Sequence, residues 1–307
     1  MFTSNEYIIP SNFCRYSGDK IKFKIVPIIP GKNWITEVRL PFYLKAKDFF
    51  DDYLKQNSSA SVLFDGCTPE IKTLLDDYGF HSLLVGQEAI LNLNVNHFKK
   101  KSLKALIKRG YRHGSVKELS FSSENLKLLE AFKRHTSIAK LPKLNHLFCT
   151  TFEEFTRMFV FVDKKSEWLG LITISHKTQN IMQTELILRR AKNPVGVMEV
   201  LIFEIFNTLK KEGKEFWSLG AVPFVVKVPF SFSKQWLINF IGRRLRFAYN
   251  YKGLFAFKNK FMPAWIDYYI CSGNNLSFLQ LSDMMRKTKL LSLVMKKIYS
   301  KFWIKNE

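Results

Sequence analysis

The feature that most restricts the fold of this chain is an alternation of helix and strand patterns that occurs in two separate parts. Residues 193–220 contain a Pro/Gly turn, an apolar helical pattern, a Lys-rich end with Gly213, and finally a strand pattern. Residues 68–86 follow the same plan, because Thr68 is placed to cap a helix that begins with proline and Gly79 is placed to stop it. Helices that lead into strands in both parts predict a mixed α/β (α+β) protein.

Shorter runs of β-branched and aromatic residues extend this prediction along the chain. Strands are predicted within the runs KIKFKIVPII, SVLF, MFVFVD and WLGLITIS, and a further helix within SENLKLLEAFKRH. With 307 residues, of which 47% are hydrophobic, the chain can bury a sizeable core as one large domain or two ordinary ones. No Pro/Ser/Gly linker separates two free domains, and no strong internal repeat is present.

Charge is the second strong feature, since 48 Lys and Arg outnumber 26 Asp and Glu and give a formal net charge of +22. Such an excess attracts polyanions over long distances, so a nucleic acid or an anionic membrane surface is the expected partner. The densest basic run, at residues 99–114, is predicted to be a helix with a row of cations four residues apart on one face. The cations of this run are Lys100, Lys104, Lys108 and Arg112, with Arg109 beside them. A solvated helix face is the alternative interpretation.

Several chemistries are disfavoured by the residues present. The four cysteines have neither C-x-x-C spacing nor neighbouring His pairs, which argues against a zinc site and a disulfide framework and fits a reducing cytoplasm, so no metal is expected. The chain has no Walker loop, no G-x-G-x-x-G after a strand, no G-x-S-x-G and no H-E-x-x-H. The N-terminus lacks a secretory pattern and no apolar run is long enough to span a bilayer, so any membrane contact is expected to be peripheral.

Residues 271–307 are predicted to form a separate tail. Apolar residues such as Met285, Leu290 and Val294 are interspersed with Lys and Arg there, which is typical of a basic amphipathic helix on a membrane surface. A C-terminal helix that docks its apolar side on the domain explains the same pattern.

Three stretches, taken in order, resemble a known family. The first begins VLFDGCTPEIKTLL at residue 62, contains a G-F-x-x-x-x-x-G-x-E-A pattern that includes Glu88, and leads into the basic run. The second begins TELILRRAKNPVG at residue 184 and ends in LGAVPF, and the third contains YKGLFAFKNKFMPAW. Over about residues 60 to 270, these stretches resemble the cytosolic C-terminal domain of bacterial phosphatidylglycerol lysyltransferase, the multiple peptide resistance factor, and its aminoacyl-phosphatidylglycerol synthase relatives.

The resemblance implies two GNAT-like subdomains joined by a basic helix, a dual-GNAT acyltransferase architecture. On this basis the chain is expected to divide into an N-terminal GNAT-like subdomain at 1–98, the basic connecting helix at 99–114, a C-terminal GNAT-like catalytic subdomain at 115–270 and the basic tail at 271–307.

The implied reaction passes the aminoacyl group of a charged tRNA, with lysyl as the first expectation, to a hydroxyl of phosphatidylglycerol or another anionic lipid. An aminoacyl ester is already activated, so the transfer needs positioning, proton transfer and oxyanion stabilisation, but no cofactor. The expected partners are therefore aminoacyl-tRNA and an anionic membrane surface. The expected location is the cytoplasm, including the inner face of the cytoplasmic membrane.

The resemblance also implies site residues. Arg189, Lys258 and Lys260 match cationic positions of the family and are expected to grip phosphate or the developing negative charge. The family's acidic position falls on Leu186, with Glu185 just before it. Either a local shift turns Glu185 into the site, where it binds the substrate's α-amino group or assists proton transfer, or the acid is missing. The cations of the basic run are expected to bind tRNA or lipid phosphates.

Other functions stay open at this point. The same transfer to a soluble peptide or metabolite fits the residues, and so does a basic RNA- or membrane-binding protein without catalysis. For Lys258 and Lys260 the structural alternative is a strand edge protected by charge. The sequence does not identify the amino acid carried, the acceptor or the oligomeric state.

Overall fold

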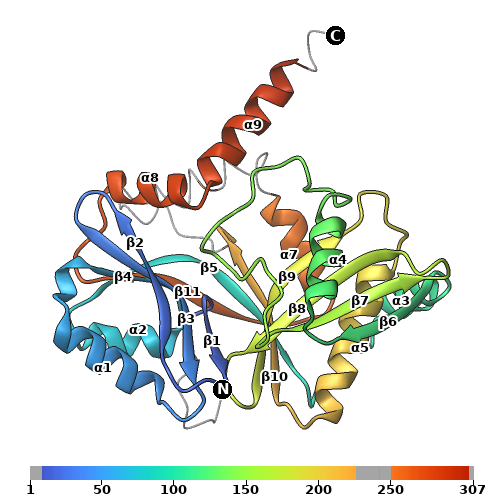
Figure 1. The fold of residues 1–307 in the computed structure, drawn as a ribbon, viewed down its shortest axis with the longest axis horizontal. Helices are drawn as coiled ribbons and strands as arrows, with labels where there is room; N and C mark the ends of the chain where they lie inside the picture. Colours follow the sequence, from blue (N-terminus) through green and yellow to red (C-terminus); the bar gives the residue numbers. More distant parts are fainter. Residues whose placement is uncertain (1–8, 226–241, 243–249, 304–307) are drawn as a thin grey trace.

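The computed structural model describes residues 9–225, 242 and 250–303 (Figure 1). The strands are β1 Phe13–Tyr16, β2 Lys22–Ile28, β3 Lys32–Pro41, β4 Val62–Cys67, β5 His81–Asn92, β6 Gly114–Leu119, β7 Arg157–Asp163, β8 Trp168–His176, β9 Ile181–Arg189, β10 Phe216–Pro223 and β11 Ala264–Ser272. The helices are α1 Ala46–Gln56, α2 Pro69–Asp76, α3 Lys101–Tyr111, α4 Ser123–Lys133, α5 Val197–Lys211, α7 Tyr251–Asn259, α8 Phe278–Lys287 and α9 Leu290–Trp303. This mixture confirms the α/β prediction.

All of these strands belong to one sheet, in the order β1-β3-β4-β11-β5-β10-β9-β8-β7-β6, with β2 paired to β3. Strand β11 comes late in the chain but lies between β4 and β5, antiparallel to both. Strand β1 pairs with β3 and also meets β8 through Arg15 and His176, so the path of paired strands closes on itself. The division at residues 98, 114 and 270 stays a prediction, because strands from both parts share this sheet.

The local signals read from the sequence are confirmed where they can be compared. The Thr68 hydroxyl accepts a hydrogen bond of 3.4 Å from the Ile71 amide and caps α2. Gly79 and Gly213 have φ angles of 75° and 73°, the left-handed conformation that ends a helix and that glycine adopts without steric cost. Lys258 and Lys260, which could have protected a strand edge, instead lie at the end of helix α7 and directly after it.

Helices cover the two parts of the sheet separately (Figure 1). In the N-terminal part, Phe49 and Phe50 of α1 and Ile71 of α2 pack on strands β3 and β4. In the C-terminal part, α3 and α5 share a larger apolar cluster with strands β5 and β7 to β10, around the fully buried Trp217. Burial of an aromatic or aliphatic side chain contributes about 1.5–3 kcal/mol, so these clusters fix which face of the sheet remains for polar groups.

Helices α3 and α5 approach closely because glycines face each other across the contact. A Cβ atom added to Gly110 would lie 2.4 Å from the carbonyl oxygen of Gly196, the N-cap residue of α5. We expect Gly110→Val to lower the free energy of unfolding by about 2 kcal/mol, because the packed helices would have to separate. Urea unfolding measures this, with Ser102→Val on the exposed side of α3 as the control. A Gly110→Val protein as stable as the control would contradict the tight contact.

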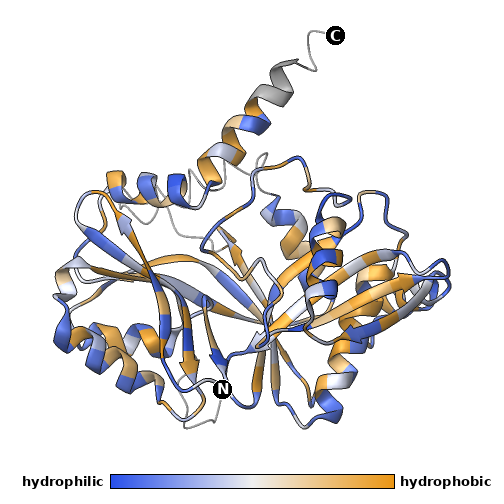
Figure 2. Cartoon of the chain, viewed as in Figure 1, coloured by the Kyte–Doolittle hydropathy of each residue, from blue (hydrophilic) through white to orange (hydrophobic). Residues whose placement is uncertain are grey.

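The two C-terminal helices differ in how they meet the rest of the protein. Helix α8 docks on the β2–β3 hairpin: the Gln280 side chain donates to the Pro30 carbonyl at 2.6 Å, and the Asp283 carboxylate accepts from the Ile29 amide at 3.0 Å. Helix α9 leads away from the body, and Figure 2 shows hydrophobic and hydrophilic residues interspersed along both helices. Across residues 9–225, 242 and 250–303, no helix combines the length and apolar character needed to cross a membrane.

Candidate active site

Strands β9 and β10 separate partway along their length. They pair in parallel only from Phe216 to Ser218 on β10, after which β10 is bulged and continues against β5 alone. The bulge contains Gly220, whose φ of 86° suits glycine. A Cβ atom on Gly220 would lie 3.4 Å from the Lys258 ammonium nitrogen and 3.8 Å from the Thr184 carbonyl oxygen of β9. The Lys258 side chain therefore ends where the two strands part.

Lys258 is buried, with 3% of its surface exposed, and its Nζ donates to the carbonyls of Gly220 at 2.8 Å and Ala221 at 3.1 Å. Burial lowers the pKa of Lys258 to about 7, and the nearby Glu88 carboxylate offsets only part of this effect. An amine with this pKa is available in both protonation states near neutral pH. That is the property expected of a group that moves a proton.

A buried ion pair lies beside this lysine. Lys177 Nζ contacts both carboxylate oxygens of Glu88, at 2.7 and 2.9 Å, and the Ser218 hydroxyl donates to the same carboxylate at 2.6 Å. All three side chains are almost fully buried. A buried charge must be paired and hydrogen-bonded to be tolerated, and here both charges meet that condition.

Glu185 points to the same side of β9 as Gln183, at a position where the strand is bulged. Thr173 of β8 pairs with Leu186 and the next residue, Ile174, pairs with Thr184, so Glu185 is skipped in the ladder. One oxygen of Glu185 accepts from the Ser175 hydroxyl at 2.6 Å and the Gln183 amide at 2.8 Å. The strand is therefore bulged at Glu185, while Leu186 itself packs in the apolar cluster under α4, and the role of Glu185 stays a prediction.

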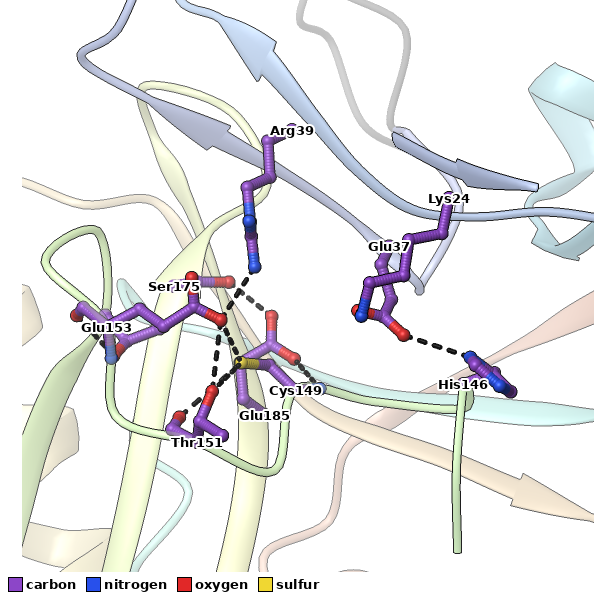
Figure 3. Close-up of polar contacts among 10 residues, drawn as sticks. Lys24, Glu37, Arg39, His146, Cys149, Thr151, Glu153, Ser175 and Glu185 are labelled. Carbon is purple, nitrogen blue, oxygen red and sulfur yellow. Dashed lines mark hydrogen bonds and ion pairs between the residues drawn. The ribbon is translucent and has the colours of Figure 1, made fainter. Parts of the chain in front are cut away.

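The environment of Glu185 is closed and polar. Its second oxygen accepts from the Cys149 amide at 3.0 Å, and burial raises the pKa of its carboxyl group above the usual value (Figure 3). Lys177 acts in the opposite direction on this pKa, so its ammonium, which is paired with Glu88, lies within electrostatic reach of Glu185. The loop that carries Cys149 therefore lies directly against Glu185.

A small cavity of about 30 Å³ lies against Glu185. Its lining comes from β1, β3, β9 and the loop before β7, and consists of Asn12, Cys14, Glu37, Arg39, His146, Phe148, Cys149, Phe155 and Glu185. Burial acts to raise the pKa of Glu37, but hydrogen bonds from Lys24 and His146 outweigh it and hold this pKa below its ordinary value. Figure 3 shows Glu37 and Glu185 on either side of the space, with Arg39 bound to Glu153 at 2.7 Å. A space of this size holds a water molecule or an ammonium group.

The other two predicted site residues lie apart from this centre. Arg189 is exposed at the end of β9, about 13 Å along the strand from Glu185 at 3.3 Å per residue. Lys260 is half-exposed and pairs with the buried Glu199 of α5 at 2.8 Å. The structure thus brings Lys258 close to Glu88 and Glu185 close to Lys177, but it does not bring Arg189 or Lys260 to them.

Sequence reasoning missed the partners that complete the site: Ser175, Lys177, Gln183 and Ser218. The Gln183 and Glu185 pair was a usable signal, since polar residues two apart in an otherwise apolar strand share a face. The sequence gives no such signal for Lys177, because a lysine next to the turn residues TQN is ordinarily solvated. Within the described part of the chain, no group of three or more His, Cys, Asp or Glu side chains is arranged to hold a metal ion.

The basic run forms helix α3, as predicted, with Lys100 as its N-cap residue. The cations Lys100, Lys104, Lys108, Arg109 and Arg112 are all exposed. Among the described residues, no carboxylate lies within 4.0 Å of any of the five. This leaves an uncompensated positive surface over one end of the C-terminal part.

Comparison with known proteins identifies the family to which the chain is similar. Residues 46–272 match the family described as "Phosphatidylglycerol lysyltransferase, C-terminal". The chain is 26% identical over 251 residues to the phosphatidylglycerol lysyltransferase of Bacillus subtilis (strain 168); the match covers 78% of this chain but only 29% of that protein.

Two solved structures share the fold. The structure of L-PGS from Bacillus licheniformis matches with a TM-score of 0.70 and 21% identity, over 88% of this chain and 85% of that one. The C-terminal domain (DUF2156) of a putative lysylphosphatidylglycerol synthetase from Agrobacterium fabrum matches with a TM-score of 0.63 and 18% identity, over 86% and 83%. The GNAT-like α/β fold expected from the resemblance is thereby confirmed, and the chain belongs to the phosphatidylglycerol lysyltransferase C-terminal family.

Proposed function

We propose that this protein is an aminoacyltransferase that moves an aminoacyl group, lysyl first, from charged tRNA to phosphatidylglycerol or another anionic lipid. The observation that carries the proposal is Lys258: a buried amine with a pKa of about 7, held where β9 and β10 part, in a chain of this family. Transfer between esters needs a group that takes a proton from a hydroxyl and returns it to another, and such an amine does both.

The hydrogen bonds of Lys258 suit it to the role of base. A neutral amine has two N–H groups and one lone pair. Its two N–H groups donate hydrogen bonds to the carbonyls of Gly220 and Ala221. The lone pair then takes the proton of the acceptor hydroxyl as its oxygen attacks the ester carbon. When the bond to the tRNA ribose breaks, the ammonium returns this proton to the ribose oxygen. The reaction balances without metal, ATP or a covalent enzyme intermediate.

The cavity at Glu185 is assigned to the ammonium of the aminoacyl group. Glu185 and Glu37 place carboxyl groups on two sides of a space that fits one ammonium, and a cation bound there would favour the ionised form of Glu185. Arg189, exposed where β9 leads into the turn before α5, is assigned to a phosphate of either substrate. Lys260 acts as a positioning residue in this proposal, because its ion pair with Glu199 ties the end of α7 to the first turn of α5.

The exposed cations of α3 support binding of tRNA or lipid phosphates, which needs charge more than base-specific contacts. A cytoplasmic location follows from the tRNA substrate. Peripheral attachment to the inner face of the membrane is supported by an apolar tip made of Ile29 in the β2–β3 turn and Phe278 and Leu279 at the start of α8. Ile29 is 64% exposed and Leu279 71% exposed, and the basic helices α8 and α9 continue from this tip.

If the apolar tip attaches the protein to the membrane, polar substitutions there weaken its binding to vesicles. Ile29→Ser combined with Leu279→Ser is expected to weaken binding to phosphatidylglycerol vesicles at least about tenfold, because each buried apolar side chain contributes about 1.5–3 kcal/mol. Vesicle cosedimentation measures the partition coefficient. The control combines Leu128→Ser of α4 with Phe121→Ser just before this helix, two residues outside the tip that are 44% and 40% exposed. Equal loss in both double variants would rule out the tip as the attachment point.

The function itself is tested by incubating the protein with a pool of labelled aminoacyl-tRNAs and phosphatidylglycerol vesicles, followed by solvent extraction. Label from one amino acid in the lipid phase supports the proposal and identifies the donor. Label that leaves the tRNA only after a soluble cell extract is added points to a peptide or metabolite as acceptor. Label that never leaves the tRNA, although tRNA binds with a steep salt dependence, favours the non-catalytic binding protein.

A further inference from the structure

A groove runs between helices α3 and α5, on the face of the sheet away from the Glu185 cavity. It has a volume of about 440 Å³ and is lined by Asn96, Phe98, Lys104, Ile107, Lys108, Tyr111 and Phe203. This volume lies in the range of small-molecule sites, about 300–1,000 Å³. The groove is distinct from the cavity at Glu185, since no lining residue is shared.

The floor of the groove is apolar, and its rings are already interlocked. Phe98 meets Phe203 at 4.9 Å between ring centres with an interplanar angle of 86°, and Phe206 at 5.0 Å and 75°. Phe98 also contacts Phe261, at 6.0 Å and 68°. In such edge-to-face packing each ring covers the face of another, so Phe98 offers no open face on which a nucleobase could stack. A flexible hydrocarbon chain needs only apolar surface and suits this floor better.

The rim of the groove is cationic. Lys104 and Lys108 are one helical turn apart, which places their Cβ atoms about 5–6 Å from each other, and both are exposed. An acid of the facing helix α5, Glu204, already accepts a hydrogen bond from the Tyr111 hydroxyl that lines the groove. Two neighbouring ammonium groups above an apolar floor match the phosphate and the hydrocarbon of one amphiphilic anion.

We propose that this groove binds an anionic phospholipid, with an acyl chain on the floor of Phe98, Ile107 and Phe203 and the phosphate between Lys104 and Lys108. The role of this lipid as acceptor rests on the function proposed above. The floor contacts the segment that carries the proposed base, since Phe98 packs on Phe261, three residues after Lys258. The positive surface of α3 is thereby divided: Arg109 lies about 140° around the helix from Lys104 and stays free for tRNA.

Binding is measured by calorimetric titration of the full chain with dioctanoyl-phosphatidylglycerol below its micelle concentration, so that no bilayer is present. Lys104→Gln combined with Lys108→Gln is expected to weaken binding at least tenfold. Lys117→Gln combined with Lys127→Gln removes the same charge from exposed positions on β6 and α4 and is expected to leave the affinity within twofold. Equal affinities in these two double variants would overturn the proposal.

The apolar half of the site is tested separately. Phe203→Gln, checked for an unchanged unfolding midpoint, is expected to weaken binding of the lipid at least fivefold and to leave binding of glycerophosphoglycerol, which has no chains, unchanged. If the headgroup alone binds as tightly as the lipid, the acyl-chain part of the proposal is wrong. If a CCA oligonucleotide binds and the Lys104 and Lys108 variants lose it instead of the lipid, the groove belongs to the tRNA end.

The binding experiments test the groove separately from aminoacyl transfer. Lipid binding that depends on Lys104, Lys108 and Phe203, without transfer of label from tRNA, would uphold the groove and refute the proposed function. Transfer to phosphatidylglycerol at an unchanged rate in variants of these three residues would support the proposed function and refute the groove as the lipid site.

Discussion

Replacing Lys258 with methionine is expected to lower the rate of aminoacyl transfer by about 10²–10⁴-fold, the usual contribution of a positioned acid–base group. Methionine fills nearly the same volume but has no proton to exchange. The rate is measured in single turnovers with excess protein, which separates the chemical step from substrate binding. Lys252→Met, an exposed lysine on the same helix α7, is the matched control and is expected to keep the native rate.

The pH dependence of the native protein follows from the same amine. Because burial lowers the pKa of Lys258 to about 7, the rate is expected to fall below pH 7 as the base becomes protonated and to level off above it. A rate that stays flat from pH 6 to pH 9 after correction for spontaneous ester hydrolysis would show that another group accepts the proton.

The lowered pKa of Lys258 also makes the free energy of unfolding depend on pH, in a direction that can be worked out. Between pH 7 and the ordinary lysine value of 10.5, the unfolded chain holds a proton that folded Lys258 has released. The free energy of unfolding of the native protein is therefore expected to rise with pH in this window, relative to Lys258→Met, by at most about 1.4 kcal/mol per pH unit. Below pH 7 both states are protonated and the difference becomes constant. Urea unfolding of both proteins at several pH values measures it.

Replacing Lys177 with methionine is expected to reduce the free energy of unfolding by about 3–5 kcal/mol, the largest stability effect expected from a single change here. The substitution leaves the Glu88 carboxylate buried, and among the described residues only the Ser218 hydroxyl then remains as its hydrogen-bond donor. An unpaired buried charge costs more than the pair itself contributes. Chemical denaturation at pH 7 reports the loss.

The companion experiment removes both charges. Glu88→Gln combined with Lys177→Met is expected to recover most of the stability, because neither partner then remains charged in the interior. Arg157→Met serves as the control for an exposed ion pair, since its contacts with Glu118 and Glu212 lie at the surface, and should cost about 1 kcal/mol or less. A Lys177→Met protein no less stable than this control would falsify the buried pair.

Much of the fold follows from local patterns in the sequence. The cap at Thr68 and the glycines at 79 and 213 fix helix ends through backbone conformations that few other residues adopt. The apolar periodicity of α5 and the cationic row of α3 predict both helices, because each pattern has the period of a helix.

The candidate site was only partly predictable, for a physical reason. Lys258 was found through the family resemblance, but its burial depends on the bulge at Gly220 and on α7, which lie far apart in sequence. The pairing register at Glu185 depends on a bulge that skips one residue, and no local pattern distinguishes a bulged strand from a regular one. Lys177 reads as a turn lysine until the fold brings Glu88 of β5, a strand distant in sequence, to it.

The position of β11 has a consequence for how the chain is made. Strand β5 is apolar and nearly buried, yet both of its neighbours, β10 and β11, lie more than a hundred residues later. At ordinary translation rates the ribosome completes β11 on the order of 10–40 s after β5. Strands β1 to β4 can pair with one another as the nascent chain emerges, but β5 cannot join them until β11 is available to lie between β4 and β5. This family member should fold late and as one unit, and β5 is the segment that a chaperone would have to shield until then.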